Sequence, residues 1–392
     1  MVVLLINTND KGGAATACIR IHEELLRQGV KSRILFLNKT REDIPHAYYF
    51  NKKLSIFKRI EIKLKTLFSK SIDIKKMFNV EWFSYPYSKY DVTNHFLYKE
   101  AEVIQFNWVS GFLDETSFFR KNDKPIVWRM PDLYCCGGGY HYEKDVPFQQ
   151  LTNVLSKNSK IRQKALKNAT IHFVPISKWV FDKAQKSHLI QDFPKTIIHN
   201  GLDFSIFKPL DKQKARELLS LPMDKKIVLL GADQIKTKRK GFNEALKALE
   251  MIGRKDIQPV IFGKTKEELP TYLINLGYIN NIEKLIQVYS AADIFLMPSL
   301  EEAFGQVTIE ALSCGIPVVS FPNGGSLDII NNGMNGELAE DFSFEALFKA
   351  LSKALLTTYN SEMIIKDVKT RFDISNKVCE YIDLYKAILY ER

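Results

Sequence analysis

Cysteine is scarce in this sequence. Five cysteines occur among 392 residues, an odd number without paired Cys-x-x-Cys spacing, which excludes a disulfide framework and a cysteine-based zinc site. Long apolar runs are also missing. The opening MVVLLINTND turns polar too early for a signal peptide, and no run reaches the ~18 apolar residues of a membrane-spanning helix. We therefore expect a protein kept in the reducing cytoplasm, with contact to a membrane surface left open.

Acidic residues are the minority charge. The chain has 56 Lys and Arg against 45 Asp and Glu, a net charge of +11 at pH 7. Such an excess indicates an anionic partner, which is a phosphate-bearing ligand, an anionic membrane or a nucleic acid. The basic residues are not interleaved with the aromatic motifs of RNA-binding modules, so we expect no nucleic acid.

The first half of the chain alternates short apolar runs with stretches of helical spacing. Residues 2–6 are expected to form a buried strand, 7–13 a glycine-containing loop, 16–27 a helix and 32–37 a second strand. This is the pattern of a strand–helix–strand unit. Further expected strands occupy residues 103–106, 126–128 and 171–174. The order predicts a parallel, doubly wound sheet.

A second set with the same rhythm follows a polar stretch near residues 200–225. Its expected strands occupy residues 227–230, 258–262, 276–278, 294–297 and 318–320. Its expected helices occupy residues 243–252, 282–289 and 309–313. The chain is therefore expected to contain two Rossmann-like halves joined in the polar stretch. An amphipathic stretch at residues 378–390 lies outside both sets.

Residues 52–76, KKLSIFKRIEIKLKTLFSKSIDIKK, differ from the rest. Nine Lys or Arg stand here against Glu61 and Asp73. A helix would place Phe57, Ile60, Leu64, Leu67 and Phe68 on one face. This pattern fits an interfacial helix on an anionic membrane surface. It fits equally a surface helix whose apolar stripe packs on the first domain, and the sequence leaves both readings open.

The most unusual local pattern is SLEEAFGQVTIEALSCGIPVV, residues 299–319. Glu302 is expected in a loop at the carboxyl end of a strand, the edge where doubly wound sheets bind ligands. Gly305 permits close approach of the backbone to a ligand, and a helix starting near Gln306 would direct its first amides at phosphate or sugar. Glu310 lies about one turn into that helix. Because the Phe-Gly break separates the two carboxylates, both can face one cleft.

Several stretches together resemble the retaining glycosyltransferases of family 4. The 299–321 stretch resembles their E-x7-E signature, and YSAADIFLMPS resembles the segment that leads into it. IIHNGLDFSIFKP looks like the segment at their domain junction, and GGAATACIRIHEELLRQGVKSRIL like their glycine loop and first helix. PIVWRMPDLYCCGGGYHY resembles a segment of the subgroup that assembles bacterial surface polysaccharides. The resemblance spans nearly the full chain in the expected order.

The resemblance implies an α/β protein with two Rossmann-like doubly wound domains facing a cleft, the GT-B architecture. Residues 1–199 plus 376–392 would form the N-terminal, acceptor-side domain, and residues 200–375 the nucleotide-sugar domain. The implied activity is retaining transfer of a sugar, in the hexosyltransferase class, from a nucleotide-diphosphate sugar to a glycan or lipid-linked acceptor in surface polysaccharide biosynthesis. No cofactor and no metal are implied, and the chain lacks the metal-binding Asp-x-Asp motif of the other major glycosyltransferase fold.

The resemblance also implies roles for residues of the second half. Without a metal, cations and helix N-termini must stabilise the departing phosphate, and Arg239 and Lys240 match the basic residues that contact the diphosphate. Glu302 would contact the transferred sugar as a catalytic residue, and Glu310 the ribose hydroxyls. The remaining donor-binding residues would be Ala303, Phe304, Gly305, Gln306, Gly12 and Gly13.

In the first half, the subgroup segment points to an acceptor or sugar side. Its candidate residues are Asp132, Gly138, Gly139 and His141. The subgroup normally carries a His before the Asp, and here Pro131 occupies that place. This departure motivates an alternative function, a non-catalytic sugar-nucleotide-binding protein derived from the same fold. A nucleotide-sugar epimerase on this fold is a further alternative, which the E-x7-E context disfavours.

Overall fold

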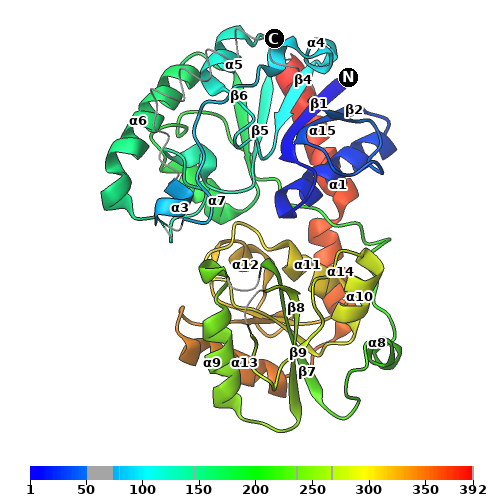
Figure 1. Ribbon diagram of the computed structural model, residues 1–392. Helices are drawn as coiled ribbons and strands as arrows, with labels where there is room; N and C mark the ends of the chain where they lie inside the picture. The colour runs from blue at the N-terminus through cyan, green and yellow to red at the C-terminus, as the bar shows by residue number, and fades with distance from the viewer. Residues whose placement is uncertain (51–73, 79, 145, 235–236, 266–267, 391–392) are drawn as a thin grey trace. The chain divides into compact units, whose positions relative to one another are not determined.

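The computed structural model describes residues 1–50, 74–78, 80–144, 146–234, 237–265 and 268–390 (Figure 1). The chain divides into two compact units. Unit 1 contains Met1–Ile176, Val180–Ile198 and Val378–Arg392. Unit 2 contains Ser177–Trp179 and His199–Lys377.

Unit 1 is built on a parallel sheet of the order β3-β2-β1-β4-β5-β6 in its described residues. The strands are β1 (Val2–Asn9), β2 (Lys31–Asn38), β3 (Ala47–Tyr49), β4 (Val103–Phe106), β5 (Ile126–Met130) and β6 (Ile171–Pro175). The helices are α1 (Gly13–Arg27), α3 (Ile74–Phe78), α4 (Phe96–Glu100), α5 (Glu115–Lys121), α6 (Phe148–Leu166) and α7 (Lys178–Gln185), with short 3₁₀ turns η1 (Val92–Asn94) and η2 (Tyr134–Cys136). The central strands are apolar and buried at nearly every position, as strands covered on both faces must be.

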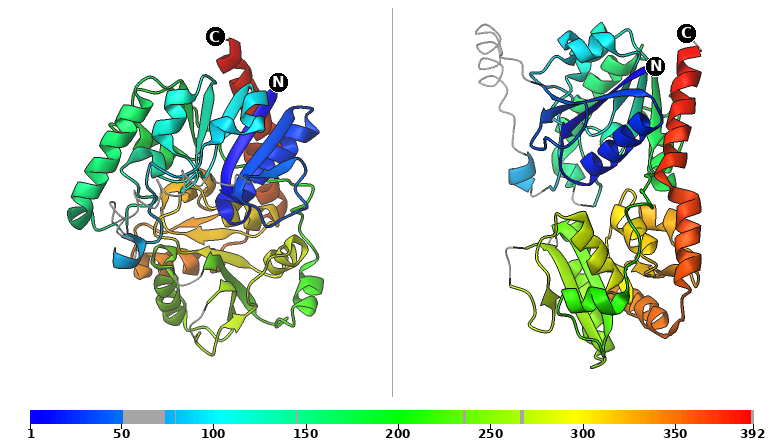
Figure 2. Two further views of the ribbon diagram at one scale, coloured as in Figure 1. Left: turned by 45° about the horizontal axis from the view of Figure 1, so that its top comes forward. Right: turned by 90° about the vertical axis from the view of Figure 1, so that its right-hand side faces the viewer.

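The end of the chain belongs to the core of unit 1. Helix α15 (Ile374–Tyr390) runs beside α1 (Figures 1 and 2). Val378, Tyr381 and Tyr385 of this helix are at most 1% exposed, and the Tyr385 hydroxyl donates to the side-chain oxygen of Gln105 in β4. Each buried side chain of this size contributes roughly 1.5–3 kcal/mol, so the last helix stabilises the first unit.

Unit 2 repeats the plan, with the strand order β12-β11-β10-β7-β8-β9, all parallel, among its described residues. The strands are β7 (Lys226–Gln234), β8 (Ile257–Lys264), β9 (Ile274–Asn275), β10 (Ile294–Met297), β11 (Val318–Ser320) and β12 (Gly336–Leu338). The helices are α8 (Lys212–Leu218), α9 (Phe242–Ile252), α10 (Ile282–Ser290), α11 (Gln306–Ser313), α12 (Gly324–Ile329), α13 (Phe344–Leu356) and α14 (Ser361–Phe372), with a 3₁₀ turn η3 (Lys238–Lys240). One core cluster joins β7, β8 and β10 to α9 and α13.

Some of the expected strands have different bounds in the structure. β1 continues to Asn9 instead of ending at residue 6, because the Asn7 side chain accepts a bond from the Trp108 amide at 2.7 Å and so satisfies its polar group inside the sheet. The strand expected at residues 276–278 lies at Ile274–Asn275. Leu276 N still donates to the Ile261 carbonyl of β8 at 2.8 Å, and Gly277, which adopts φ of +70°, accepts a bond from Gly263 N at 2.9 Å.

The polar stretch at residues 200–225 is not a free linker. It lies within unit 2, where Arg216 of α8 donates to the Ala291 carbonyl at 3.0 Å and pairs with Asp293 at 2.6 Å. These contacts fix the stretch although its composition is that of a loop. The basic segment at residues 52–76 lies outside the described residues up to residue 73. Ile74, which opens α3, is buried in a cluster with Leu151 of α6.

Candidate functional site

A buried carboxylate with two cations lies at the carboxyl end of β10. The Glu302 side chain is 13% exposed, and its Oε2 is 2.5 Å from Lys240 Nζ and 3.6 Å from Arg239 Nη1. Burial by itself raises the pKa of Glu302. The charges of Lys240 and Arg239, together with bonds from Lys240 and the Ala303 amide, outweigh burial and lower the pKa below its ordinary value. Glu302 is therefore held as a carboxylate near neutral pH.

The basic turn is fastened to the loop after β10 by backbone contacts. Leu300 N donates to the Arg239 carbonyl at 2.7 Å, and Arg239 Nη1 donates to the Glu301 carbonyl at 3.2 Å. Gly241 follows the turn with φ of +62°, and a Cβ there would lie 1.8 Å from the Pro298 carbonyl oxygen. Only glycine permits this approach. Gly241 thus allows the basic turn to approach the end of β10 and brings Arg239 and Lys240 close to Glu302. Local propensity alone does not explain a glycine at this position.

A second glycine-containing turn, Asn323–Gly325 at the start of α12, holds the other side of the Glu302 loop. Gly325 N donates to the Glu302 carbonyl at 3.0 Å, and the Asn323 side chain donates to the Ser299 carbonyl at 2.7 Å. A Cβ on Gly325 would lie 2.0 Å from the Phe304 carbonyl oxygen. The Asn323–Gly325 turn therefore packs directly on the backbone that carries Glu302. Sequence reasoning did not identify this turn as part of the site, although its Asn-Gly-Gly composition signals a special backbone.

Glu310 lies on α11, which begins just beyond Gly305. Gly305 adopts φ of +88° at the start of this helix, a conformation that favours glycine. The Glu310 side chain is 6% exposed and its Oε2 accepts a bond from the Tyr289 hydroxyl at 3.3 Å. Tyr289, on α10, is a further site residue that the sequence did not reveal, because it comes from another element.

The residues between the two carboxylates are mostly buried. Ala303 and Phe304 are 2% and 1% exposed, and Gln306 is half-buried. The Ala303 amide bonds to the carboxylate of Glu302. The Phe304 ring packs edge-on against Phe372 with centroids 5.7 Å apart. Phe304 thus anchors the loop through its side chain.

The glycine loop of unit 1 is exposed. Gly12 caps the start of α1 and Gly13 is its first residue, Gly12 has φ of +95°, and no atom lies within 4 Å of a Cβ built on either glycine. The loop is held at its base by Asp10, which is 2% exposed and accepts bonds from the Thr40 amide and from the Arg41 amide at 2.6 Å. Asp10 was not among the predicted residues.

Asp132 and His141 form a buried pair in the same unit. His141 Nδ1 is 2.6 Å from Asp132 Oδ2, and His141 Nε2 is 2.7 Å from Ser84 Oγ. Trp108 Nε1 donates to Asp132 Oδ2 at 3.1 Å. Asp132 is 5% and His141 0% exposed. The pair therefore holds the turn between residues 132 and 141 from inside.

Gly138 and Gly139 serve close packing. A Cβ on Gly138 would lie 2.3 Å from the Leu155 carbonyl oxygen in α6, and one on Gly139 would lie 2.4 Å from the Ser84 carbonyl oxygen. Both glycines are buried. The two glycines therefore allow the backbone of this turn to pack closely against α6 and against the segment around Ser84.

The predicted residues fall into two groups. Arg239, Lys240, Glu302 and the 303–310 segment come together in unit 2. Gly12, Gly13, Asp132, Gly138, Gly139 and His141 lie in unit 1. Within the described ranges, no group of three or more His, Cys, Asp or Glu side chains is placed to hold a metal ion. No helix in the described part of the chain has the length and apolar composition needed to cross a membrane.

Comparison with known proteins relates the segment that carries the Glu302 site to one family. Residues 211–371 match the family model of glycosyl transferases group 1. Curated relatives include D-inositol 3-phosphate glycosyltransferases. The protein from Mycolicibacterium vanbaalenii is 29% identical over 173 residues, covering 37% of this chain and 36% of the relative. That from Catenulispora acidiphila is 33% identical over 161 residues, covering 36% and 38%. The chain thus spans little more than a third of the length of these relatives.

Solved structures match along the whole chain. Sucrose-phosphate synthase from Thermosynechococcus elongatus aligns with a TM-score of 0.70 at 18% identity, covering 100% of both chains. Anabaena HepE in complex with UDP and glucose aligns with a TM-score of 0.69 at 15% identity, covering 98% and 99%. The prediction of two Rossmann-like α/β domains is confirmed: the two parallel-sheet α/β units match GT-B glycosyltransferase structures. The group 1 match and the curated relatives both relate part of this chain to glycosyltransferases.

Proposed function

We propose that this chain is a retaining glycosyltransferase that moves a sugar from a nucleotide-diphosphate sugar to a glycan or lipid-linked acceptor. One observation carries the proposal. Glu302 is held as a carboxylate by Lys240 and Arg239 at a strand end, inside the segment that matches the group 1 glycosyl transferases. Solved structures of the same fold in complex with UDP and UDP-glucose make a uridine diphosphate sugar the first donor to test.

The proposed chemistry follows from the charges. As the bond from sugar to diphosphate breaks, negative charge grows on the leaving phosphate and positive charge on the sugar ring. Arg239 and Lys240 supply fixed positive charge for the leaving group, which makes a metal unnecessary in this proposal. Glu302, ionised and close to both cations, supplies the negative charge that faces the sugar. Glu310, on the neighbouring helix α11, accepts hydrogen bonds from the ribose hydroxyls.

The two carboxylates give the test of this assignment. Ribose contacts form equally in the ground and transition states, whereas contacts at the reacting sugar change with the chemistry. Glu310→Ala is therefore expected to weaken binding of UDP in calorimetry. Glu302→Gln is expected to slow turnover while UDP binding stays near the wild-type value. Glu340→Gln, which alters an exposed carboxylate in the same unit, is the matched control.

Turnover is measured by mass spectrometry on a panel of nucleotide sugars. Equal UDP affinity of Glu310→Ala and the wild type would remove the ribose role. Full turnover by Glu302→Gln would remove the catalytic role. A wild-type protein that binds UDP but neither hydrolyses nor transfers any sugar of the panel would favour the non-catalytic alternative.

We further propose a role in surface polysaccharide biosynthesis at the inner face of the cell membrane. The support is the composition of residues 52–76, whose excess of seven positive charges would attract an anionic leaflet by about 1 kcal/mol per nearby cation. The protein is expected to bind liposomes that contain phosphatidylglycerol and to be released by salt. Changing Lys58, Arg59, Lys63 and Lys65 to Glu should abolish this binding. A wild type that ignores such liposomes at low salt would contradict the proposal.

A further inference from the structure

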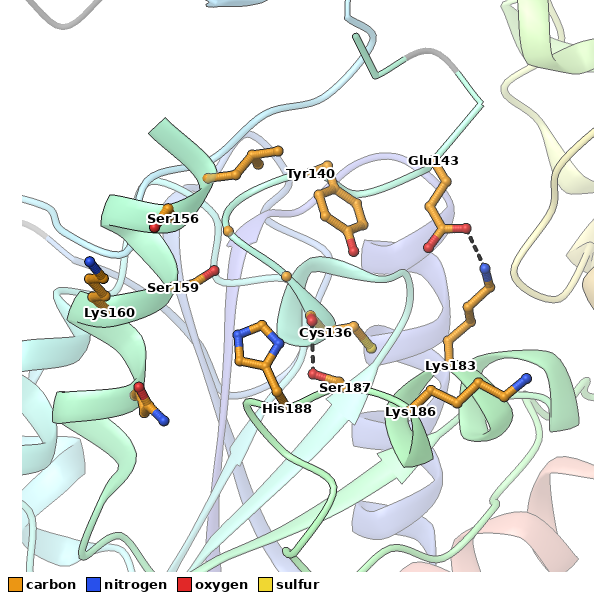
Figure 3. Close-up of a pocket in the computed structure, with 14 residues that line it drawn as sticks. Cys136, Tyr140, Glu143, Ser156, Ser159, Lys160, Lys183, Lys186, Ser187 and His188 are labelled. Atoms are coloured by element: carbon orange, nitrogen blue, oxygen red, sulfur yellow. Dashed lines mark hydrogen bonds and ion pairs between the residues drawn. The ribbon is translucent and has the colours of Figure 1, made fainter. Parts of the chain in front are cut away.

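Unit 1 contains a cavity whose lining includes none of the residues discussed for the donor site. It has a volume of about 630 Å³, within the range of roughly 300–1,000 Å³ typical of ligand pockets. Figure 3 shows it between α6 on one side and the end of α7 on the other. Ser159 and His188 point into the space from opposite sides, and the Tyr140 hydroxyl points into it from the turn after β5.

The walls of this cavity are held in place by buried polar contacts. Asn158 of α6 donates to the Gly138 carbonyl at 2.7 Å, and Arg162 Nη1 donates to the Gly137 carbonyl at 2.8 Å. Ser187 Oγ donates to the Cys136 carbonyl at 2.8 Å and so ties the opposite wall to the same turn. All three side chains are at most 6% exposed. The cavity is therefore pre-formed, which lowers the entropic cost of binding a ligand.

A buried ion pair supports the same wall. Arg162 contacts Glu115 of α5 through two bonds of 2.9 and 2.8 Å, with both side chains at most 1% exposed. The Arg162 guanidinium also lies 4.1 Å from the centre of the Tyr134 ring. Burying such a pair is costly unless every group is satisfied. Here the spare donors of the guanidinium reach the carbonyls that shape the cavity.

The lining combines hydroxyl and amide groups with an aromatic ring. Ser156, Ser159 and Gln163 line it from α6 and Tyr140 from the turn. The Tyr140 ring lies against Gly137, where a Cβ would be 2.3 Å from a ring carbon. Hydroxyl and amide groups both donate and accept, as sugar hydroxyls require, and an aromatic ring offers an apolar face to the C–H groups of a sugar. The cavity is also several times larger than an inorganic anion.

Positive charge surrounds the cavity. Lys160, Lys183 and Lys186 line it, and among the described residues Glu143 is the only acid of the lining, already paired with Lys183. The chain has no Asp or Glu between residues 146 and 176, although five Lys or Arg occur there. The balance of the lining is therefore positive at neutral pH. A solvated basic helix would explain the surface lysines, but it would not explain the cavity or the buried network that keeps it open.

We propose that this cavity binds a saccharide that carries an anionic group. The serine hydroxyls, Gln163 and Tyr140 recognise the sugar ring, and Lys160 and Lys186 recognise the carboxylate or phosphate attached to it. This assignment rests on the function proposed above. The ligand is then an acidic unit of the acceptor glycan held by unit 1. The anion has two sources to distinguish, a uronate carboxylate and a sugar phosphate.

The test measures binding to the full-length protein by calorimetry and saturation-transfer NMR. The carboxylate probe is a hyaluronan tetrasaccharide, with its carboxyl-reduced form as the neutral match. The phosphate probe is mannose 6-phosphate, with mannose as its match. At least one acidic probe is expected to bind more tightly than its neutral match by about tenfold or more, the value of a charge-assisted hydrogen bond.

Variants locate the site. The double variant Lys160→Glu with Lys186→Glu is expected to weaken binding of the acidic probe by about tenfold or more. Ser159→Tyr, which fills the cavity, should weaken this binding independently. Lys157→Glu is the matched control, because Lys157 is exposed on the same helix and does not line the cavity. No binding of any probe, equal binding of acidic and neutral probes, or unchanged binding by the cavity variants would each overturn the proposal.

UDP binding by the same samples separates the two proposals. A protein that binds UDP but no acidic saccharide contradicts the cavity inference alone. A protein that binds the acidic saccharide through the cavity but neither binds UDP nor turns over a nucleotide sugar contradicts the transfer function and leaves the cavity as a saccharide-binding site.

Discussion

Gly325→Ala is the sharpest test of how the Glu302 loop is positioned. The added Cβ would lie 2.0 Å from the Phe304 carbonyl oxygen and 2.2 Å from the Phe304 Cα. Because both are backbone atoms, a side-chain rotation cannot relieve the contact. The loop that carries Glu302 must therefore move away from the Asn323–Gly325 turn by about 1 Å, and the Gly325 N bond to the Glu302 carbonyl must lengthen or break.

The expected effect is on turnover more than on donor binding. A displacement of about 1 Å at a catalytic group costs on the order of 100-fold in rate. Overpacking of a well-packed contact costs about 1–3 kcal/mol in stability. Glu310 lies beyond Gly305 in α11, and the atoms nearest to an added Cβ on Gly325 all belong to Phe304. We therefore expect kcat to fall about 100-fold, with UDP affinity close to that of the wild type.

The assay compares kcat, UDP affinity and thermal unfolding for Gly325→Ala and Gly333→Ala. Gly333 adopts φ of +77° with no atom within 4 Å of an added Cβ, so its replacement strains the backbone in the same unit without moving the Glu302 loop. The control should lose about 1 kcal/mol of stability and keep its activity. If Gly325→Ala retains kcat within about threefold of wild type, the Gly325 contact does not position the catalytic loop.

Three further predictions concern charge. Arg239→Ala combined with Lys240→Ala should cost about 3 kcal/mol in kcat/KM; activity that survives the double change would mean that other groups stabilise the leaving phosphate. Lys240→Gln removes a cation that lowers the pKa of Glu302, so the acid limb of the pH–rate profile should move to higher pH, and an unmoved limb would exclude Glu302 as the titrating group. Arg162→Met leaves the Glu115 carboxylate buried without its partner, which should cost about 3–5 kcal/mol of folding stability in chemical denaturation; a loss under about 1 kcal/mol would contradict a pair formed in solution.

Much of the fold followed from short-range patterns in the sequence. The strands expected at residues 103–106 and 294–297 have these bounds in the structure, because each is a brief apolar run with clear polar flanks. The short strands β3 and β12 went unrecognised, since three residues carry too little periodicity to separate a strand from a loop. Strand β9 was misplaced by two residues, because Leu276 and Tyr278 continue the apolar alternation past the end of the strand at Asn275.

The sequence named candidate residues that lie together in unit 2, but it did not predict their contacts. Glu302 and Lys240 are separated by 62 positions, and nothing in either local stretch indicates that they form an ion pair. Tyr289 and the Asn323–Gly325 turn reach the site from other elements, so only the fold reveals them. The burial of His141 at 0% exposure and its pairing with Asp132 were likewise not predicted by its motif, and its role on the acceptor or sugar side stays a prediction.

The last helix has a consequence for the order in which the protein is made. Unit 1 begins at the first residue but includes Val378–Arg392, and Tyr381 and Tyr385 fill its interior. The ribosome therefore releases the residues that complete this unit only after all of His199–Lys377 has emerged. The second unit has its whole sequence available earlier, so it is free to fold while the first still exposes the apolar groove for α15. A premature stop near residue 377 would leave that groove permanently open and mark the shortened chain for aggregation or proteolysis.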